Sequence, residues 1–208
     1  MIAIIDYGMG NLRSVQKALE KLGYEAEISG DKQVIAGASG VILPGVGAFK
    51  DAMENLKEAG LVETIKEVEA QNKPFLGICL GLQLLFTKSE ENGLHQGLDI
   101  LPGRVIRFKG DKKVPHMGWN QAEIVNQSPI LKGIPSQSFF YFVHSYYVVP
   151  DDEKVIAAET EYGERFTSVA ARNNLFGIQF HPEKSSKLGL KILNNFGELV
   201  SSVDNPGH

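Results

Sequence analysis

Short apolar runs alternate with segments of helical periodicity through the first half of the chain. The expected strands lie at residues 2–5, 25–28, 41–43 and 75–78. Apolar residues at helical spacing predict helices at residues 12–22, 32–36, 49–71 and from residue 82 onward. The long third segment contains Gly60, where we expect a hinge. This alternation predicts a mostly parallel central sheet flanked by helices on both faces.

The second half has a different pattern, with apolar strands joined by short polar turns. These expected strands lie at residues 104–108, 121–125, 139–149, 155–161, 168–171 and 175–180. They indicate antiparallel additions to the sheet, followed by a closing helix over residues 187–200. No linker or repeat divides the chain. We therefore predict a single α/β domain over residues 1–200, and a disordered tail over residues 201–208.

Composition supports one compact domain and excludes some classes of partner. The chain has 208 residues, of which 43% are hydrophobic, enough for a sizeable core. The net charge of −4, without a long basic run, argues against nucleic acid or an anionic membrane as the main partner. The first residues lack the basic region of a signal peptide, and no apolar run approaches the length of a membrane span. With a single cysteine no internal disulfide can form, so we expect a cytoplasmic protein.

The only cysteine lies in the segment Gly-Ile-Cys-Leu-Gly, where an expected strand passes into an expected helix. This is the layout of a nucleophile elbow, in which Gly77 and Gly81 flank Cys79 because the tight turn leaves no room for Cβ atoms. The turn places the thiol at a helix N-terminus, which favours the thiolate, and leaves the N–H of Leu80 free to hold an oxyanion. On this segment alone, a buried structural thiol remains an alternative.

His181 follows the expected strand at residues 175–180 and precedes Pro182 and Glu183. Pro182 holds His181 extended and ends strand pairing. Residues i and i+2 of an extended chain project to the same side, so Glu183 can orient the imidazole while its other nitrogen faces a thiol. The segment could instead be two ligands of a metal, although no third donor is evident, or an ordinary polar strand end. Parallel strands deliver their carboxyl ends to one sheet edge, which favours a joint site with Cys79.

Several segments together resemble the class I, or triad, glutamine amidotransferases. They are Pro-Gly-Val-Gly at residues 44–47, Gly-Ile-Cys-Leu-Gly-Leu-Gln at 77–83 and His-Pro-Glu at 181–183. Further segments, at residues 6–12, 44–49, 114–120 and 141–146, resemble the glutaminase subunits of imidazole glycerol phosphate synthases. The resemblance extends over residues 2–200 and implies a class I glutamine amidotransferase-like fold, with no cofactor and no metal.

The resemblance also implies a mechanism. Cys79 would attack the carboxamide of glutamine, and His181, oriented by Glu183, would protonate the departing ammonia. Water would then hydrolyse the glutamyl thioester to glutamate. The ammonia would pass to a separate (β/α)8-barrel cyclase subunit in a heterodimer. That subunit would make imidazole glycerol phosphate and an aminoimidazole carboxamide ribotide in histidine biosynthesis.

Other site residues are assigned by their positions in the resembling segments. The oxyanion would be held by backbone donors of Gly45, Val46 and Leu80. The amino-acid end of glutamine would be held by Gly47, Gln83, Glu91, Ser145 and Tyr146. The cyclase subunit would contact Met117, Trp119, Asn120, Tyr141 and Lys184. From the residues alone, Trp119 and Tyr141 could be core aromatics, and Lys184 could be an ordinary solvated lysine.

Glycines on both sides of Val46 suggest a regulated oxyanion site. They would permit a peptide flip, so that the donor points away until the cyclase subunit docks. On its own, the Pro-Gly-Val-Gly segment could be a plain strand-ending turn. A dinucleotide-binding loop after the first strand is rejected, because Arg13 stands where G-x-G-x-x-G needs its third glycine.

Three other functions fit parts of the sequence. The first is the glutaminase subunit of another synthase, for anthranilate, aminodeoxychorismate or pyridoxal phosphate, against which residues 114–120 argue. The second is a non-catalytic binding subunit, against which the intact Cys79, His181 and Glu183 count. The third is a free-standing cysteine hydrolase or peptidase, which would need no partner for turnover.

Overall fold

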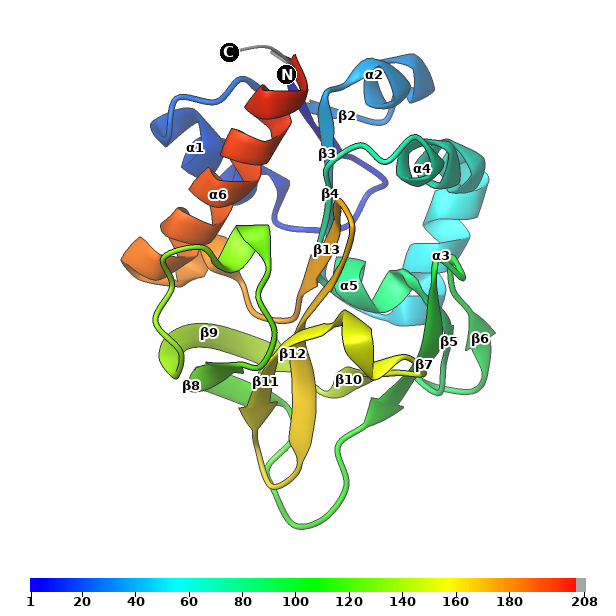
Figure 1. The fold of residues 1–208 in the computed structure, drawn as a ribbon. Helices are drawn as coiled ribbons and strands as arrows, with labels where there is room; N and C mark the ends of the chain where they lie inside the picture. The colour runs from blue at the N-terminus through cyan, green and yellow to red at the C-terminus, as the bar shows by residue number, and fades with distance from the viewer. Residues whose placement is uncertain (205–208) are drawn as a thin grey trace.

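The first half of the chain builds most of the parallel part of a sheet that has thirteen strands within the residues the structure describes (Figure 1). The structure is a computed structural model that describes residues 1–204. Its first elements are β1 (Ile2–Ile5), α1 (Leu12–Lys21), β2 (Ala26–Ser29), α2 (Lys32–Gly37), β3 (Gly40–Gly45), α3 (Phe49–Glu58), α4 (Leu61–Ala70), β4 (Phe75–Cys79) and α5 (Leu80–Leu84). β1 pairs in parallel with β2 and β3, β3 with β4, and β4 with β13 (Leu175–Ile178). The predicted strand–helix alternation is confirmed here.

The second half extends the sheet mainly with antiparallel strands. They are β5 (Phe86–Ser89), β6 (His95–Gln96), β7 (Leu101–Arg107), β8 (His116–Ile124), β9 (Ser138–His144), β10 (Tyr146–Pro150), β11 (Ile156–Glu161) and β12 (Arg165–Arg172). Short 3-10 turns lie at Pro129–Leu131, Glu153–Val155 and Pro182–Lys184, and the closing helix is α6 (Ser186–Asp204). Among these eight strands, the one parallel pairing is that of β5 with β7.

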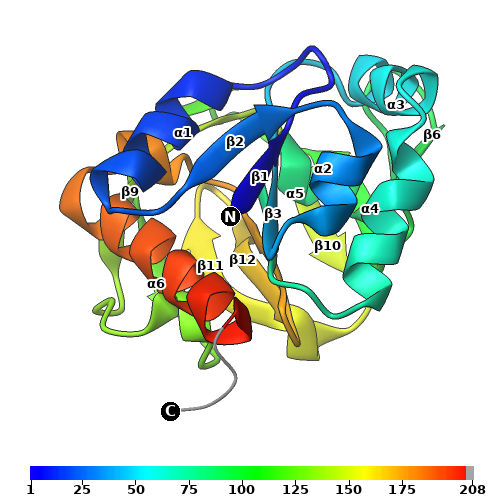
Figure 2. The same cartoon turned by 90° about the horizontal axis from the view of Figure 1, so that it is seen from above.

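Helices cover both faces of the parallel strands (Figure 2). Successive side chains of β1 point to opposite faces. Ile2 and Ile4 therefore pack in one core with residues of α1 and α6, while Ala3 and Ile5 pack in a second core with residues of α2, α3 and α4. Every residue of β1, β3 and β4 is buried, because both faces are covered. This explains why these strands have continuous apolar sequences rather than alternating ones.

The hinge expected at Gly60 is present. α3 ends at Glu58, α4 begins at Leu61, and Gly60 adopts a φ of 66°. That left-handed conformation is accessible to glycine at little cost, so the chain can change direction between the two helices.

The single strand predicted over residues 139–149 is wrong. The chain divides at Ser145, with β9 ending at His144 and β10 beginning at Tyr146. β9 pairs with β8 in a hairpin, whereas β10 pairs with β7 and β12. Because the two strands pair with different partners, the chain must break between them. The continuous apolar pattern of residues 139–149 gives no sign of this break.

Several element boundaries also differ from the predictions, three of them in the following ways. α5 ends at Leu84, and the chain returns to a strand at Phe86, where it pairs with β7. β8 begins at His116 rather than at residue 121. α6 continues through Asp204, so residues 201–204 are helical, while residues 205–208 of the predicted tail lie outside the described residues. None of the helices within residues 1–204 is long and apolar enough to cross a membrane.

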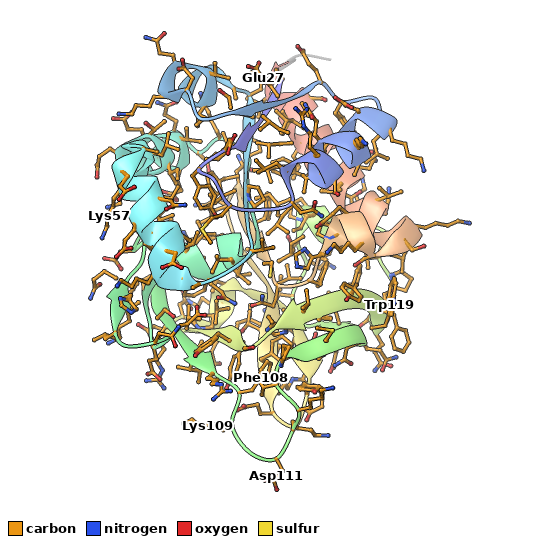
Figure 3. All side chains as sticks on the ribbon, turned by 180° about the vertical axis from the view of Figure 1, so that it is seen from behind. Glu27, Lys57, Phe108, Lys109, Asp111 and Trp119 are labelled. Atoms are coloured by element: carbon orange, nitrogen blue, oxygen red, sulfur yellow. The ribbon has the colours of Figure 1, made fainter. Side chains whose placement is uncertain are left out.

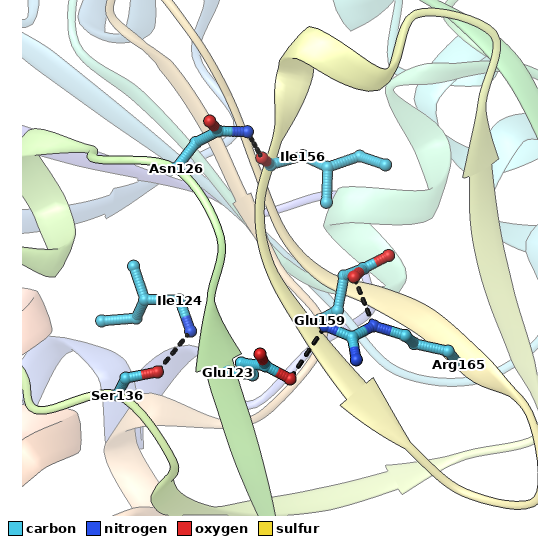
Figure 4. Close-up of polar contacts among 7 residues, drawn as sticks. All are labelled: Glu123, Ile124, Asn126, Ser136, Ile156, Glu159 and Arg165. Atoms are coloured by element: carbon cyan, nitrogen blue, oxygen red, sulfur yellow. Dashed lines mark hydrogen bonds and ion pairs between the residues drawn. The ribbon is translucent and has the colours of Figure 1, made fainter.

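Polar contacts fasten β8 to the rest of the sheet (Figure 4). Arg165 of β12 pairs with Glu159 of β11 at 2.5 Å and with Glu123 of β8 at 2.8 Å. Beyond the end of β8, the Asn126 side chain donates to the carbonyl of Ile156 at 2.7 Å. Exposed ion pairs contribute little stability singly, but together these contacts hold β8 beside β11.

Candidate active site

Two neighbouring parallel strands carry the candidate nucleophile and base to one edge of the sheet. Ile78 of β4 and Ile178 of β13 are opposite each other in the register. Cys79 and Gln179 therefore leave the sheet side by side, and His181 follows two residues later. The structure thus brings together two segments that lie about a hundred residues apart in the sequence, as expected for carboxyl ends of parallel strands.

Cys79 occupies a strained turn between β4 and α5. Its φ of 55° and ψ of −109° are unusual for a residue with a side chain. A Cβ atom added at Gly77 would lie 2.7 Å from the carbonyl oxygen of Gly81. One added at Gly81 would collide with the carbonyl oxygen of Leu43 in β3. The two glycines therefore permit the close packing that the elbow requires.

We expect Gly81→Ala to lower the free energy of unfolding by about 3 kcal/mol or more. The added methyl group would meet the backbone of Leu43, which cannot move aside as a flexible side chain can. Urea unfolding measures the effect. Gly37→Ala in α2 is a matched control, because nothing lies within 4 Å of a Cβ there. Equal stability of the two variants would contradict the expected collision.

His181 lies buried between a carboxylate and the thiol. Its Nδ1 is 2.9 Å from Oε1 of Glu183, and the two side chains are only 2% and 1% exposed. Burial by itself lowers the pKa of His181, but the interactions with Cys79 and Glu183 outweigh burial and raise that pKa to about 10. These interactions favour the protonated imidazole, which can donate a proton to a leaving group.

A cavity of about 280 Å³ opens onto the thiol. Its size is below that of pockets for drug-sized ligands and suits a single amino acid. Its lining includes these sequence-predicted site residues: Cys79, His181, Val46, Leu80, Gly47, Gln83, Glu91, Ser145 and Tyr146. The Glu183 side chain is buried behind the imidazole.

Two residues expected to bind the amino-acid end of glutamine are anchored by bonds of their own. The Gln83 amide donates to the carbonyl of Tyr146 at 2.9 Å and to Oε1 of Gln179 at 3.2 Å. Glu91 Oε2 accepts from the N–H of Phe49, at the start of α3, at 2.9 Å. Burial raises the pKa of Glu91, although the Phe49 bond opposes that shift. Both side chains are thus held at the pocket before any ligand binds.

The expected oxyanion segment, residues 44–47, runs beside the elbow. A Cβ added at Gly45 would lie 2.6 Å from the hydroxyl of Tyr7, so this position requires glycine. The Tyr7 hydroxyl donates to the carbonyl of Pro44 at 2.8 Å and anchors the start of the segment. Gly47 has a φ of 103°, a conformation that other residues rarely adopt.

The residues expected at the partner interface lie mainly on the β8–β9 hairpin, where Trp119 is at the surface (Figure 3). Met117 and Trp119 are 62% and 54% exposed, so Trp119 is not a core aromatic. Trp119 is opposite Tyr141 of β9, with ring centroids 6.1 Å apart. Lys184 is exposed near the triad. Asn120 differs, because its side chain turns inward and contacts the buried His116.

Four residues at the site or behind it were not assigned from the sequence. Gln179 donates to Sγ of Cys79 at 3.7 Å, and Tyr7 anchors the oxyanion segment. His116 and His144 contact each other at 2.9 Å, and His144 lines the pocket. Gln179 could have been found from its place just after β13. The histidine pair could not, since it depends on the register between β8 and β9.

The buried histidines predict a loss of stability in mild acid. Burial lowers the pKa of His116 from 6.5 to about 4 and that of His144 to about 3. Unfolding therefore takes up protons as the pH falls below 6.5, and the free energy of unfolding should fall by up to about 1.4 kcal/mol per pH unit for each histidine. His181 contributes with the opposite sign near neutral pH, because its raised folded pKa keeps it protonated in the folded state while the unfolded state still gains a proton as the pH falls. Its contribution becomes small below about pH 6, where both states are protonated.

Urea unfolding between pH 6 and pH 5, where the contribution of His181 is small, measures this dependence. His116→Phe removes one of the two groups and should make the dependence shallower. An unchanged slope in a folded variant would contradict the assignment.

The class of the protein follows from this geometry together with its similarity to known proteins. Residues 3–199 match the family described as Glutamine amidotransferase class-I. The fold is similar to that of PurLQS from Thermotoga maritima, with a TM-score of 0.73 and 19% identity over 94% of this chain and 96% of that one. It is also similar to the glutaminase domain of Trypanosoma brucei CTPS with bound acivicin, with a TM-score of 0.68 and 16% identity over 100% of this chain and 94% of that one.

Curated relatives narrow the assignment. An imidazole glycerol phosphate synthase subunit HisH from Moorella thermoacetica is 59% identical, over 100% of this chain and 99% of the relative. Another from Syntrophotalea carbinolica is 57% identical over 96% and 100%, and one from Aquifex aeolicus is 56% identical over 93% and 94%. The chain therefore belongs to the class I glutamine amidotransferase family, among the HisH subunits of imidazole glycerol phosphate synthase. It is an enzyme subunit of the glutamine amidotransferase class.

Proposed function

We propose that this chain hydrolyses glutamine to glutamate and ammonia and passes the ammonia to a (β/α)8-barrel cyclase subunit, with which it forms a heterodimer. The cyclase uses the ammonia to make imidazole glycerol phosphate and an aminoimidazole carboxamide ribotide in histidine biosynthesis. The relatives named as HisH subunits support this choice over the other synthases. A cytoplasmic location and one domain over residues 1–200 belong to the same proposal.

The observation that carries the proposal is that Cys79 and His181 line one cavity while Glu183 contacts the far side of the imidazole. Cys79 Sγ attacks the amide carbon of glutamine to form a tetrahedral adduct. The C–N bond then breaks as His181 gives its proton to the leaving nitrogen, and a glutamyl thioester remains. His181 next removes a proton from water, which attacks the thioester and releases glutamate and the thiol. Glu183 keeps the imidazole oriented throughout.

The negative charge that develops on the amide oxygen requires nearby donors. The Leu80 N–H follows the nucleophile directly, and the backbone of Gly45 and Val46 runs beside it. The flanking glycines allow the Val46 peptide to turn, so we propose that its N–H points at the oxyanion only when the cyclase subunit is bound. The exposed Met117 and Trp119 on the β8–β9 hairpin support a docking face there.

Val46→Pro removes the proposed donor, and we expect it to reduce cyclase-stimulated glutamate release by about 100-fold. Val46→Ala keeps the N–H and serves as the control for side-chain loss, because Val46 is 42% exposed. Unchanged release by Val46→Pro would contradict a role for this N–H.

The function is tested by measuring glutamate released from glutamine under three conditions: the chain alone, with the cyclase subunit, and with that subunit plus its ribulosyl ligand. We expect the highest rate in the third condition. No stimulation there would reject the synthase assignment, and stimulation by a different synthase subunit would identify the correct one. High partner-independent turnover on other amides would instead favour a free-standing hydrolase.

A further inference from the structure

Two buried histidines outside the triad contact each other beneath the β8–β9 hairpin. His116 and His144 are opposite each other in the register, and Nδ1 of His116 lies 2.9 Å from Nε2 of His144. They are 3% and 6% exposed. The His116 ring stacks on Tyr162 at a centroid distance of 4.0 Å and on Phe142 at 4.9 Å. The mechanism above uses neither histidine, yet His144 lines the glutamine pocket.

The contact of His116 with the Asn120 side chain determines which nitrogen of His116 carries hydrogen. Nδ2 of Asn120 lies 2.9 Å from the carbonyl oxygen of Glu161 and 3.2 Å from Nε2 of His116. The Asn120 Oδ1 accepts from the N–H of Gln121 at 2.8 Å. If the amide were flipped, its oxygen would face the Glu161 carbonyl, which is also an acceptor, and its nitrogen would face the Gln121 N–H, which is also a donor. The amide nitrogen only donates, which makes Nε2 of His116 an acceptor. In the neutral ring, the hydrogen is therefore on Nδ1.

The contact of His144 with Tyr146 independently determines the direction of the hydrogen bond between the two rings. Nδ1 of His144 lies 2.8 Å from the carbonyl oxygen of Tyr146. A carbonyl only accepts, so Nδ1 of His144 carries hydrogen and its Nε2 accepts from His116. Each contact then has one donor and one acceptor, provided that both rings are neutral. Burial lowers the pKa of both histidines, which is consistent with neutral rings.

The series of bonds continues from Tyr146 to the nucleophile. The Tyr146 carbonyl also accepts from the Gln83 amide at 2.9 Å, and that amide donates its second hydrogen to Oε1 of Gln179 at 3.2 Å. Nε2 of Gln179 donates to Sγ of Cys79 at 3.7 Å. Hydrogen bonds therefore connect Asn120, which adjoins the exposed Trp119, with the pocket wall and the thiol.

We propose that His116 and His144 are positioning residues that link Asn120 on the β8–β9 hairpin to the Tyr146–Gln83 wall of the glutamine pocket, as two neutral rings with hydrogen on Nδ1. This role rests on the proposed glutaminase function. The pair holds the Tyr146 carbonyl, which in turn fixes the Gln83 amide where the amino-acid end of glutamine binds. It acts on substrate binding rather than on the reacting atoms, so its loss should raise KM for glutamine more than it lowers kcat.

The direction of the bonds is tested by nitrogen-15 NMR of the full chain labelled at histidine, at pH 7, alone and with the cyclase subunit. We expect Nδ1 of both rings to carry hydrogen and Nε2 of both to be unprotonated. The signals that disappear in His116→Phe identify that ring. Hydrogen on Nε2 of either ring, or a doubly protonated ring, would overturn the proposal. This result does not depend on turnover.

The positioning role is tested by steady-state kinetics of the complex. His116→Phe keeps an aromatic ring but removes both bonds, and we expect KM for glutamine to rise about 10-fold with kcat lowered less than about threefold. Tyr162→Phe is the matched control. It removes a hydroxyl from the same aromatic cluster, where that group donates only to the Lys113 carbonyl at 2.7 Å, and it should leave KM unchanged.

Asn120→Asp provides a second variant in case His116→Phe does not fold, because aspartate has nearly the same shape as the half-buried asparagine that it replaces. The carboxylate would replace a donor with an acceptor opposite the Glu161 carbonyl, so KM should again rise about 10-fold. An unchanged KM in Asn120→Asp, or in folded His116→Phe, would overturn the positioning role. Failure of the native complex to hydrolyse glutamine would instead reject the proposed function and leave the NMR result standing.

Discussion

Replacing Cys79 with alanine is expected to lower glutamate release by the complex at least about 10⁴-fold. The chain contains one cysteine, so no other thiol can replace the nucleophile. Without Sγ the thioester cannot form, and only direct attack by water on the bound amide remains. The backbone donors and the pocket would still bind glutamine, which is why the residual rate should exceed that in water.

The matched measurement supplies ammonia instead of glutamine to the same complex. Cys79→Ala should leave ammonia-dependent product formation by the cyclase subunit unchanged, because that reaction bypasses the thiol. Glutamate release at the native rate would show that Cys79 is not the nucleophile, and would favour a non-catalytic thiol. Loss of both reactions would indicate that the variant no longer assembles.

Glu183→Gln is expected to lower kcat for glutamate release by about 10²–10³-fold. The carboxylate accepts from Nδ1 of His181 at 2.9 Å and is one of two partners that raise the pKa of that histidine to about 10. A neutral amide removes the charge and can present a donor to Nδ1, so the imidazole is less often protonated and less well oriented. The fall in rate at alkaline pH should accordingly move to lower pH.

The pH dependence of kcat from pH 6 to pH 10 distinguishes this effect from a loss of folding. Glu153→Gln makes the same chemical change at an exposed position and should leave both the rate and its pH dependence as in the native chain. A Glu183→Gln variant with lowered kcat and no displacement of the alkaline limb would argue that the carboxylate acts through packing rather than through its charge.

The candidate triad was accessible from the sequence because its parts are local. Gly77 and Gly81 mark a tight turn around Cys79, and the short separation of His181 and Glu183 predicts that their side chains meet. The expected extended geometry is wrong beyond His181, because Pro182–Lys184 form a 3-10 turn that carries the Glu183 carboxylate to the imidazole. The meeting of these segments was also predictable. Apolar strands buried on both faces indicate a parallel sheet, whose carboxyl ends share an edge.

Other parts of the site depend on pairings that leave no local pattern. The break at Ser145 arises because β9 and β10 join different strands, although residues 139–149 have a continuous apolar character. The contact between His116 and His144 depends on the register of a hairpin whose strands are joined by a long loop. A shift of one residue would send these side chains to the opposite face.

The sequence by itself determined the fold class, the elbow and the two segments that carry the base and its carboxylate, because glycine spacing, hydrophobic period and the short separation of His181 and Glu183 act over a few residues. Only the tertiary structure decided how strongly His181 holds its proton, where Asn120 points, and that directed hydrogen bonds join the β8–β9 hairpin to the pocket. These properties come from burial and from the pairing of distant strands. They depend on distances between atoms that are remote in sequence, and no short-range pattern specifies such distances.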